Sequence, residues 1–125
     1  MSLRNPIARA KGLGSAKDGT GHWWSQRLTA IALAGLTPWF VVFAVNLLGA
    51  DQVAVRAAIA QPLTASLLSA FVLSLFWHAQ LGLQVVVEDY IHGAFELVLQ
   101  VLIKFTFALA AIASLLAIGR IAFTA

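Results

Sequence analysis

Three long stretches of the chain carry almost no charged side chains. Residues 28–50 and residues 63–87 contain no Asp, Glu, Lys or Arg, and the second stretch follows Pro62, a residue tolerated in the first turn of a helix. In residues 97–119 the single charged side chain is Lys104. About 20 apolar residues in an α-helix cross a hydrocarbon core of ~30 Å. The pattern therefore predicts three transmembrane helices.

The composition agrees with a lipid bilayer as the solvent. Of the 125 residues, 61% are hydrophobic and 10% are charged, and the mean hydropathy is +0.89, far above the values of a soluble domain. The chain has no cysteine, which excludes disulfides, thiolate metal sites and iron-sulfur clusters held by this polypeptide. We expect an all-α integral membrane bundle of three helices, with any soluble catalytic domain supplied by a partner.

The N-terminal part differs from the rest in polarity and glycine content. Residues 1–21 include four glycines from position 12 onward, which disfavour a stable helix. We therefore predict an N-terminal arm over residues 1–21 and a membrane anchor domain over residues 22–125. Its helices are expected at about 22–50, 62–89 and 95–121.

The basic residues predict the orientation of these helices. Five of the eight Lys and Arg side chains lie at or before the start of the first helix: Arg4, Arg9, Lys11, Lys17 and Arg27. The ends predicted on the opposite side carry Arg56 and Arg120. Since basic residues concentrate on the cytoplasmic side of membrane proteins, the N-terminus is predicted in the cytoplasm. This distribution favours orientation in a bilayer over binding to nucleic acid.

His78 is the strongest candidate for chemistry, because polar side chains inside a membrane are costly. It lies about 16 Å along the helix from Asp89, close to the middle of the membrane. His78, Gly82, Val85 and Asp89 fall on one helix face. A neutral imidazole is a standard axial ligand of haem, whose second histidine would come from another subunit. The alternative is a hydrogen bond between packed helices.

Three residues near the cytoplasmic interface are further candidates. Arg27 matches the geometry of haem propionates, or it orients the first helix at the interface. The hydroxyl of Tyr90 can donate to a quinone carbonyl, with Asp89 beside it to orient or relay protons. The alternative for this pair is an aromatic belt residue next to a carboxylate at a helix end.

Two runs of sequence together point to a family. The run HAQLGLQVVVEDY, residues 78–90, resembles the small membrane anchor subunit of succinate dehydrogenase, respiratory complex II. The run HWWSQRLTAIAL, residues 22–33, is similar to the start of the first helix in that family, here with Arg27, Thr29 and Ala30. The resemblance covers residues 15–92 and looks most like alphaproteobacterial members.

The resemblance implies a role for each candidate residue. His78 would be one axial ligand of the iron of haem b, with the other ligand from a larger cytochrome b anchor subunit. Tyr90 would donate a hydrogen bond to ubiquinone, with Asp89 as its neighbour at that site. Arg27 would lie near the haem propionates and the quinone pocket. Lys104 has no role in this resemblance.

The resemblance also implies partners and a location. Succinate oxidation at FAD and electron transfer through iron-sulfur clusters would take place on a flavoprotein subunit and an iron-sulfur subunit. No catalytic centre would be complete in this chain, which would dock those subunits to a bacterial inner membrane as a multi-pass protein. Two alternatives remain: a cofactor-free structural subunit or assembly factor, and the anchor of a quinol:fumarate reductase.

Overall fold

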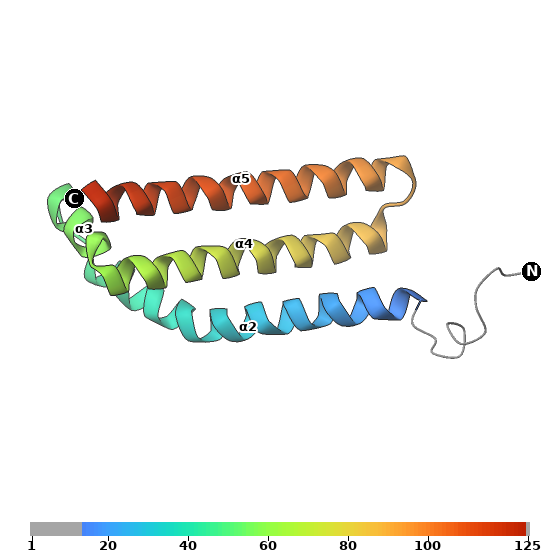
Figure 1. Ribbon diagram of the computed structural model, residues 1–125, viewed down its shortest axis with the longest axis horizontal. Helices are drawn as coiled ribbons and strands as arrows, with labels where there is room; N and C mark the ends of the chain where they lie inside the picture. The colour runs from blue at the N-terminus through green and yellow to red at the C-terminus, as the bar shows by residue number, and fades with distance from the viewer. Residues whose placement is uncertain (1–13, 125) are drawn as a thin grey trace, which may run out of the picture.

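The computed structural model describes residues 14–124, with side chains from Thr20 onward, and this part of the chain consists of helices joined by short turns (Figure 1). The elements are α2 (Gly14–Asn46), α3 (Gln52–Ala60), α4 (Pro62–Tyr90) and α5 (Ala94–Thr124). Three segments are long and apolar enough to cross a membrane: Thr20–Asn46, Pro62–Tyr90 and Ala94–Thr124. The prediction of an all-α protein with three transmembrane helices is confirmed.

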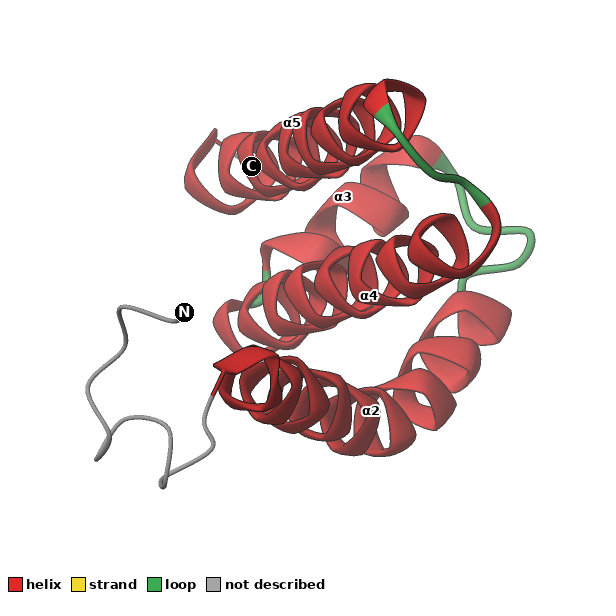
Figure 2. Ribbon diagram, turned by 90° about the vertical axis from the view of Figure 1, so that its right-hand side faces the viewer, coloured by secondary structure: helices red, strands yellow, loops and turns green. Residues whose placement is uncertain are grey.

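The three long helices lie side by side in one layer, with α4 in the middle (Figure 2). α2 contacts one side of α4 and α5 contacts the other, and α2 does not touch α5 anywhere in the part of the chain that the structure describes. The short helix α3 packs against α4 and α5 at one end. We call this the α3 end, and the opposite end, where the α4–α5 turn lies, the turn end. The arrangement is a row of helices around α4.

α2 differs from its predicted boundaries at both ends. It begins at Gly14, well before the predicted residue 22, although glycine costs about 1 kcal/mol per helical position relative to alanine. Residues 1–13 of the predicted arm lie outside the described residues. α2 ends at Asn46, and Gly49 then adopts φ 81, a left-handed conformation that suits glycine.

The connections at the two ends of α4 follow from local chemistry. The carboxylate of Asp51 caps α3 by accepting a hydrogen bond from the backbone N–H of Ala54 at 2.8 Å. Pro62 then opens α4, as predicted, because its missing N–H is not needed in a first turn. Beyond Tyr90 the chain turns into α5 through Gly93, which has φ 82. These short connections make α4 antiparallel to the helix on each side.

Few of the side chains from Thr20 to Thr124 are buried, and the buried apolar ones among them all belong to α4. They are Ala65, Leu68, Phe71, Leu81 and Val87. On the α2 side, the rings of Phe40 and Phe71 are stacked with centroids 4.5 Å apart. On the α5 side, Phe76 and Phe107 meet at 6.0 Å. The outer faces of the row carry many exposed large apolar side chains, which suits contact with lipid or with other membrane subunits.

Candidate functional site

The contact between α2 and α4 centres on His78. The residue is 12 positions from the Tyr90 end of α4 and 16 from the Pro62 end, or about 18 Å and 24 Å at the rise of a helix. Its ring is half-buried, and Nδ1 lies 3.0 Å from Oγ1 of Thr29 on α2. For Nε2 there is no hydrogen-bond partner among residues 20–124. The structure thus places an imidazole near the middle of α4 with one nitrogen engaged and one free.

Thr29 has several partners within hydrogen-bond distance. Its Oγ1 lies 2.8 Å from the carbonyl oxygen of Ser25 and 3.0 Å from that of Gln26, one turn back along α2. The residue is 6% exposed and is the single buried polar residue among the described side chains. A threonine hydroxyl in a helix commonly bonds to the carbonyl four positions earlier. Thr29 therefore joins the backbone of α2 to the ring of His78.

A second contact between α2 and α4 lies one turn closer to the turn end. Nε2–H of His22 donates to the carbonyl oxygen of Leu81 at 3.2 Å. Beside it, a Cβ added to Gly82 would lie 4.0 Å from Nε2 of Gln26, an ordinary van der Waals distance. The amide oxygen of Gln26 is buried without a partner. Gln26 of α2 therefore lies beside Gly82, with enough space left for one methyl group.

Arg27 lies away from His78. Its guanidinium carbon is 5.2 Å from the centroid of the Trp23 ring, a cation–π contact, and the side chain is exposed. Arg27 precedes the buried Thr29 by two positions, which is about 200° around the helix. The structure therefore places Arg27 on the face of α2 that points away from α4. A group bound by both Arg27 and His78 would have to reach around α2.

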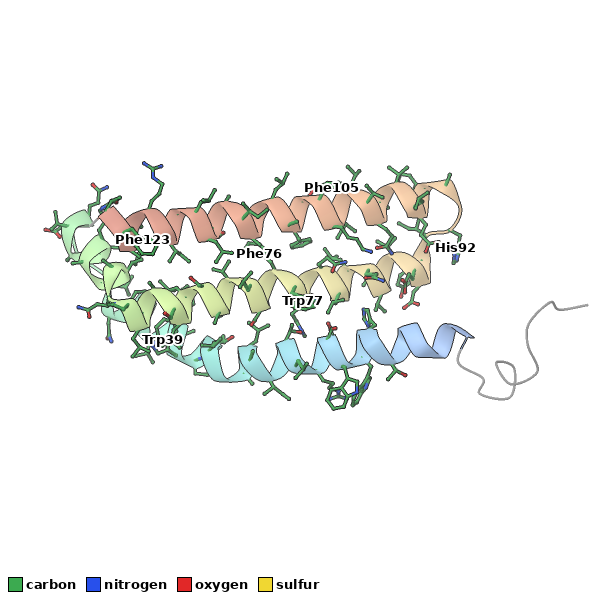
Figure 3. All side chains as sticks on the ribbon, viewed as in Figure 1. Trp39, Phe76, Trp77, His92, Phe105 and Phe123 are labelled. Carbon is green, nitrogen blue, oxygen red and sulfur yellow. The ribbon has the colours of Figure 1, made fainter. Side chains whose placement is uncertain are left out.

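Asp89 and Tyr90 end α4 at the surface of the turn end. Tyr90 is 81% exposed, and Asp89 is also exposed. His92 follows them at the start of the turn into α5, where Figure 3 shows its ring projecting from the chain. All three side chains are accessible to a ligand or a partner in this single chain, at a different depth from His78.

A chain of polar side chains that the sequence alone did not connect runs along α4 beside α5. Nε2 of Gln80 donates to Oε1 of Gln84 at 3.3 Å, and Nε2 of Gln84 donates to Oε1 of Glu88 at 3.1 Å. From α5, Nε2 of Gln100 donates to the carbonyl oxygen of Gln84 at 3.1 Å. Oε1 of Gln100 is buried without a partner. The amide nitrogens of all three glutamines are therefore hydrogen-bonded here, whereas one amide oxygen is not.

Lys104 lies at the α4–α5 contact as well. It lines a groove of about 240 Å³ together with Gln80 and apolar side chains that include Phe76 and Trp77. Figure 3 shows Phe76 in the space between α4 and α5. Because helical side chains lean toward the N-terminus of their helix, the ammonium of Lys104 leans toward the turn end of the molecule. The Lys104 side chain is exposed at this groove, and its flexible stem lets the ammonium extend toward the membrane interface.

The described residues offer single imidazoles and no cluster of metal ligands. No group of three or more His, Cys, Asp or Glu side chains comes together within the described range, 14–124. A haem held between two subunits needs one axial imidazole from each, and the free Nε2 of His78 meets that requirement. Sequence reasoning found His78 but not the contact with Thr29, although a threonine inside an apolar span was a visible signal.

The fold and the site define a small multi-pass membrane protein with one histidine deep in its central helix. Over residues 1–118 the chain matches the model of a family described as succinate dehydrogenase/fumarate reductase transmembrane subunit. The chain belongs to this family, so the resemblance seen in the sequence is confirmed. The expectation of a membrane subunit of an oxidoreductase complex is confirmed with it.

Several curated relatives support the same assignment. The succinate dehydrogenase hydrophobic membrane anchor subunit of Rickettsia bellii (strain RML369-C) is 38% identical over 89 residues, which cover 71% of each chain. That of Paracoccus denitrificans is 33% identical over 93 residues, covering 74% of this chain and 72% of the relative. That of Rickettsia conorii (strain ATCC VR-613 / Malish 7) is 40% identical over 87 residues, or 68% of each. No solved structure matches the chain significantly.

Proposed function

We propose that this chain is the small membrane anchor of a succinate:ubiquinone oxidoreductase, complex II, in a bacterial inner membrane. It docks an iron-sulfur subunit and an FAD flavoprotein subunit to the bilayer, beside a larger cytochrome b anchor subunit. The proposal is supported by the membership of the transmembrane subunit family and by relatives named as hydrophobic membrane anchor subunits. The exposed apolar faces of the row leave room for a second anchor.

His78 is proposed as one axial ligand of haem b, with the second ligand on the larger anchor. The observation that carries this role is the position of the ring: it lies near the middle of α4, Nδ1 contacts Thr29, and Nε2 has no partner among the described side chains. Haem b supplies a one-electron redox centre when it is bound. The contribution of this chain is to hold a neutral imidazole at the correct depth.

The test is the reduced-minus-oxidised absorbance spectrum of the complex that purifies with the tagged chain. His78→Ala is expected to remove the b-type signal, because His22, the other histidine at the α2–α4 contact, has its Nε2 engaged by the carbonyl oxygen of Leu81. His92→Ala is the matched control and is expected to keep the signal, since His92 is exposed on the α4–α5 turn. An unchanged spectrum in His78→Ala would remove His78 from the ligand role.

Tyr90 and Asp89 are proposed as part of the ubiquinone site. Their exposure at the end of α4 supports this role, because a quinone and the iron-sulfur subunit would both approach that end. Tyr90→Phe is expected to slow quinone reduction about 3- to 10-fold, the effect of one neutral hydrogen bond. Haem content and succinate oxidation with an artificial acceptor are expected to stay unchanged. Unaltered quinone kinetics would count against Tyr90.

Arg27 is proposed to line the quinone pocket from the outer face of α2, or to bind the haem propionates once its long side chain leaves Trp23 and turns toward His78. A guanidinium pairs with a carboxylate through two parallel hydrogen bonds, a geometry that lysine cannot reproduce. The exposed position over Trp23 leaves these donors available to a group held by a neighbouring subunit.

Two other functions have support of their own. The bond between His78 and Thr29 is a complete interhelical contact without any metal, which is what a cofactor-free structural subunit or assembly factor would need. The spectrum described above separates that function from haem binding. The family description also covers fumarate reductase, so the alternative anchor of a quinol:fumarate reductase is tested by comparing succinate oxidation with fumarate reduction in the purified complex.

A further inference from the structure

We propose that Thr29 is a positioning residue that holds His78 with its proton on Nδ1, which leaves the lone pair of Nε2 available to a metal. This inference rests on the proposed role of His78 as a haem ligand. It assigns to Thr29 an effect on the nitrogen that would bind the metal, which goes beyond holding α2 against α4.

The argument starts from the single proton of the threonine hydroxyl. Oγ1 of Thr29 lies 2.8 Å and 3.0 Å from the carbonyl oxygens of Ser25 and Gln26, and 3.0 Å from Nδ1 of His78. A carbonyl oxygen can only accept. If the hydroxyl donated its proton to Nδ1, three oxygen atoms would face one another with no hydrogen between them. Donation to the backbone removes that repulsion, and Nδ1 must then be the donor to Oγ1.

Burial makes this assignment firm. Thr29 is 6% exposed, so bulk water has little access with which to supply another proton or another acceptor at Oγ1. The hydrogen-bond network is what assigns the tautomer of a histidine when hydrogens are not observed. Here the network runs from Nδ1–H of His78 to Oγ1 of Thr29 and from the hydroxyl to the backbone of α2.

The consequence concerns the other ring nitrogen. A neutral imidazole with its proton on Nδ1 has its free lone pair on Nε2, which has no partner among the side chains described. Histidines that ligate metals usually donate their second N–H to an oxygen, which fixes the tautomer and the ring orientation. Thr29 fills this position from α2, and the register between α2 and α4 thereby orients the ligand.

The experiment uses the complex that purifies with the tagged chain. Thr29→Val keeps the shape of the side chain and removes the acceptor. It is expected to weaken haem binding about 10- to 100-fold, the usual effect of losing such a partner. It is also expected to raise the haem midpoint potential, because an imidazole whose Nδ1–H is not polarised donates less electron density to ferric iron. Thr29→Ser is expected to restore both properties.

A matched control lies on the same helix. Thr37 is exposed, so Thr37→Val makes the same chemical change away from His78 and is expected to leave haem content and potential unchanged. Wild-type haem affinity and potential in Thr29→Val would overturn the positioning role, as would a Thr29→Ser variant that behaves like Thr29→Val. If the Thr29 variants gave either of these results while His78→Ala lost the b-type signal, the role of His78 as a haem ligand would still stand.

A second measurement tests the proposal on the wild-type complex, in case the Thr29→Val variant assembles poorly. Nitrogen-15 NMR of histidine-labelled wild-type complex, depleted of haem, reports directly which ring nitrogen of His78 carries the proton. A signal from protonated Nδ1 supports the proposal, and a proton on Nε2 overturns it. A b-type signal that survives His78→Ala would instead refute the ligand role itself, so the two failures are distinguishable.

Discussion

The two interfaces of α4, with α2 and with α5, each contain a hydrogen bond from a side chain of the outer helix to a backbone carbonyl of α4. On the α2 side, His22 donates to the carbonyl oxygen of Leu81 at 3.2 Å, and on the α5 side Gln100 donates to that of Gln84 at 3.1 Å. Each side also leaves one buried amide oxygen without a partner, that of Gln26 and that of Gln100. In both interfaces, a side chain from the outer helix thus binds the backbone of the central one.

The interfaces differ in what surrounds this hydrogen bond. The α2 side combines stacked rings, Phe40 on Phe71, with a histidine whose ring is fixed by Thr29. The α5 side is a chain of flexible amides, with Lys104 in a groove beside them. A single interhelical hydrogen bond in a membrane contributes only about 0.6 kcal/mol, so the stacked rings dominate the stability of the α2 side. One interface therefore orients a ring, and the other satisfies polar groups.

Breaking the aromatic stack is expected to have the largest effect. Phe71 is 7% exposed, and Phe71→Ala leaves a cavity between α2 and α4 that costs about 3 kcal/mol. Titration of the reconstituted complex with a denaturing detergent measures the loss. Phe105→Ala on α5 is the control, because Phe105 is exposed and its removal creates no cavity within this chain. Equal losses in the two variants would show that Phe71 does not anchor α2.

A smaller effect, with the opposite sign, is expected at Gly82. A Cβ at this position meets Gln26 at 4.0 Å, and alanine is the better helix former by about 1 kcal/mol. Gly82→Ala is therefore expected to raise the stability in the same titration. Gly35→Ala, at an exposed site with open space around it, calibrates the propensity gain alone. A loss of stability at Gly82 beside a gain at Gly35 would mean that α2 packs closer to α4.

The smallest effect is a difference in stability between variants of Gln26 and Gln100, the two residues with an unpartnered amide oxygen. Gln100→Met removes a buried oxygen but also the bond to Gln84, whereas Gln26→Met removes a buried oxygen for which no side-chain bond is lost. The Gln26 variant is therefore expected to be more stable than the Gln100 variant by about 0.6 kcal/mol. The same detergent titration compares them. A reversed order would indicate that Gln26 binds a group outside this chain.

Much of the fold was predictable because long apolar runs dictate membrane helices. The start of α4 at Pro62 and its end at Tyr90 agree with the sequence prediction to within a residue. The helix α3 was not predicted, since nine residues around Arg56 give no length signal and the helix depends on its cap. The early start of α2 was not predicted, because glycine is a poor helix former and its effect is outweighed here by extension of the long helix that follows.

The site was predictable in depth but not in its contacts. Counting residues located His78 near the middle of its span, and the family resemblance supplied a role. The bond to Thr29 joins positions 49 apart, and it depends on the register of α2 against α4, which no local pattern encodes. The separation of Arg27 from His78 has the same cause. The depth of a residue can be counted along the chain, but the direction of its side chain relative to a neighbouring helix depends on how the helices pack.

The single-layer arrangement of α2, α4 and α5 has a consequence for how the protein is assembled. A closed ring of helices would have to open before a second polypeptide could touch its innermost member. In a single layer of helices, both faces of the central helix α4 that are not covered by α2 or α5 stay accessible after insertion into lipid. A neighbouring subunit can therefore diffuse in sideways and meet a central helix that already stands in its final place.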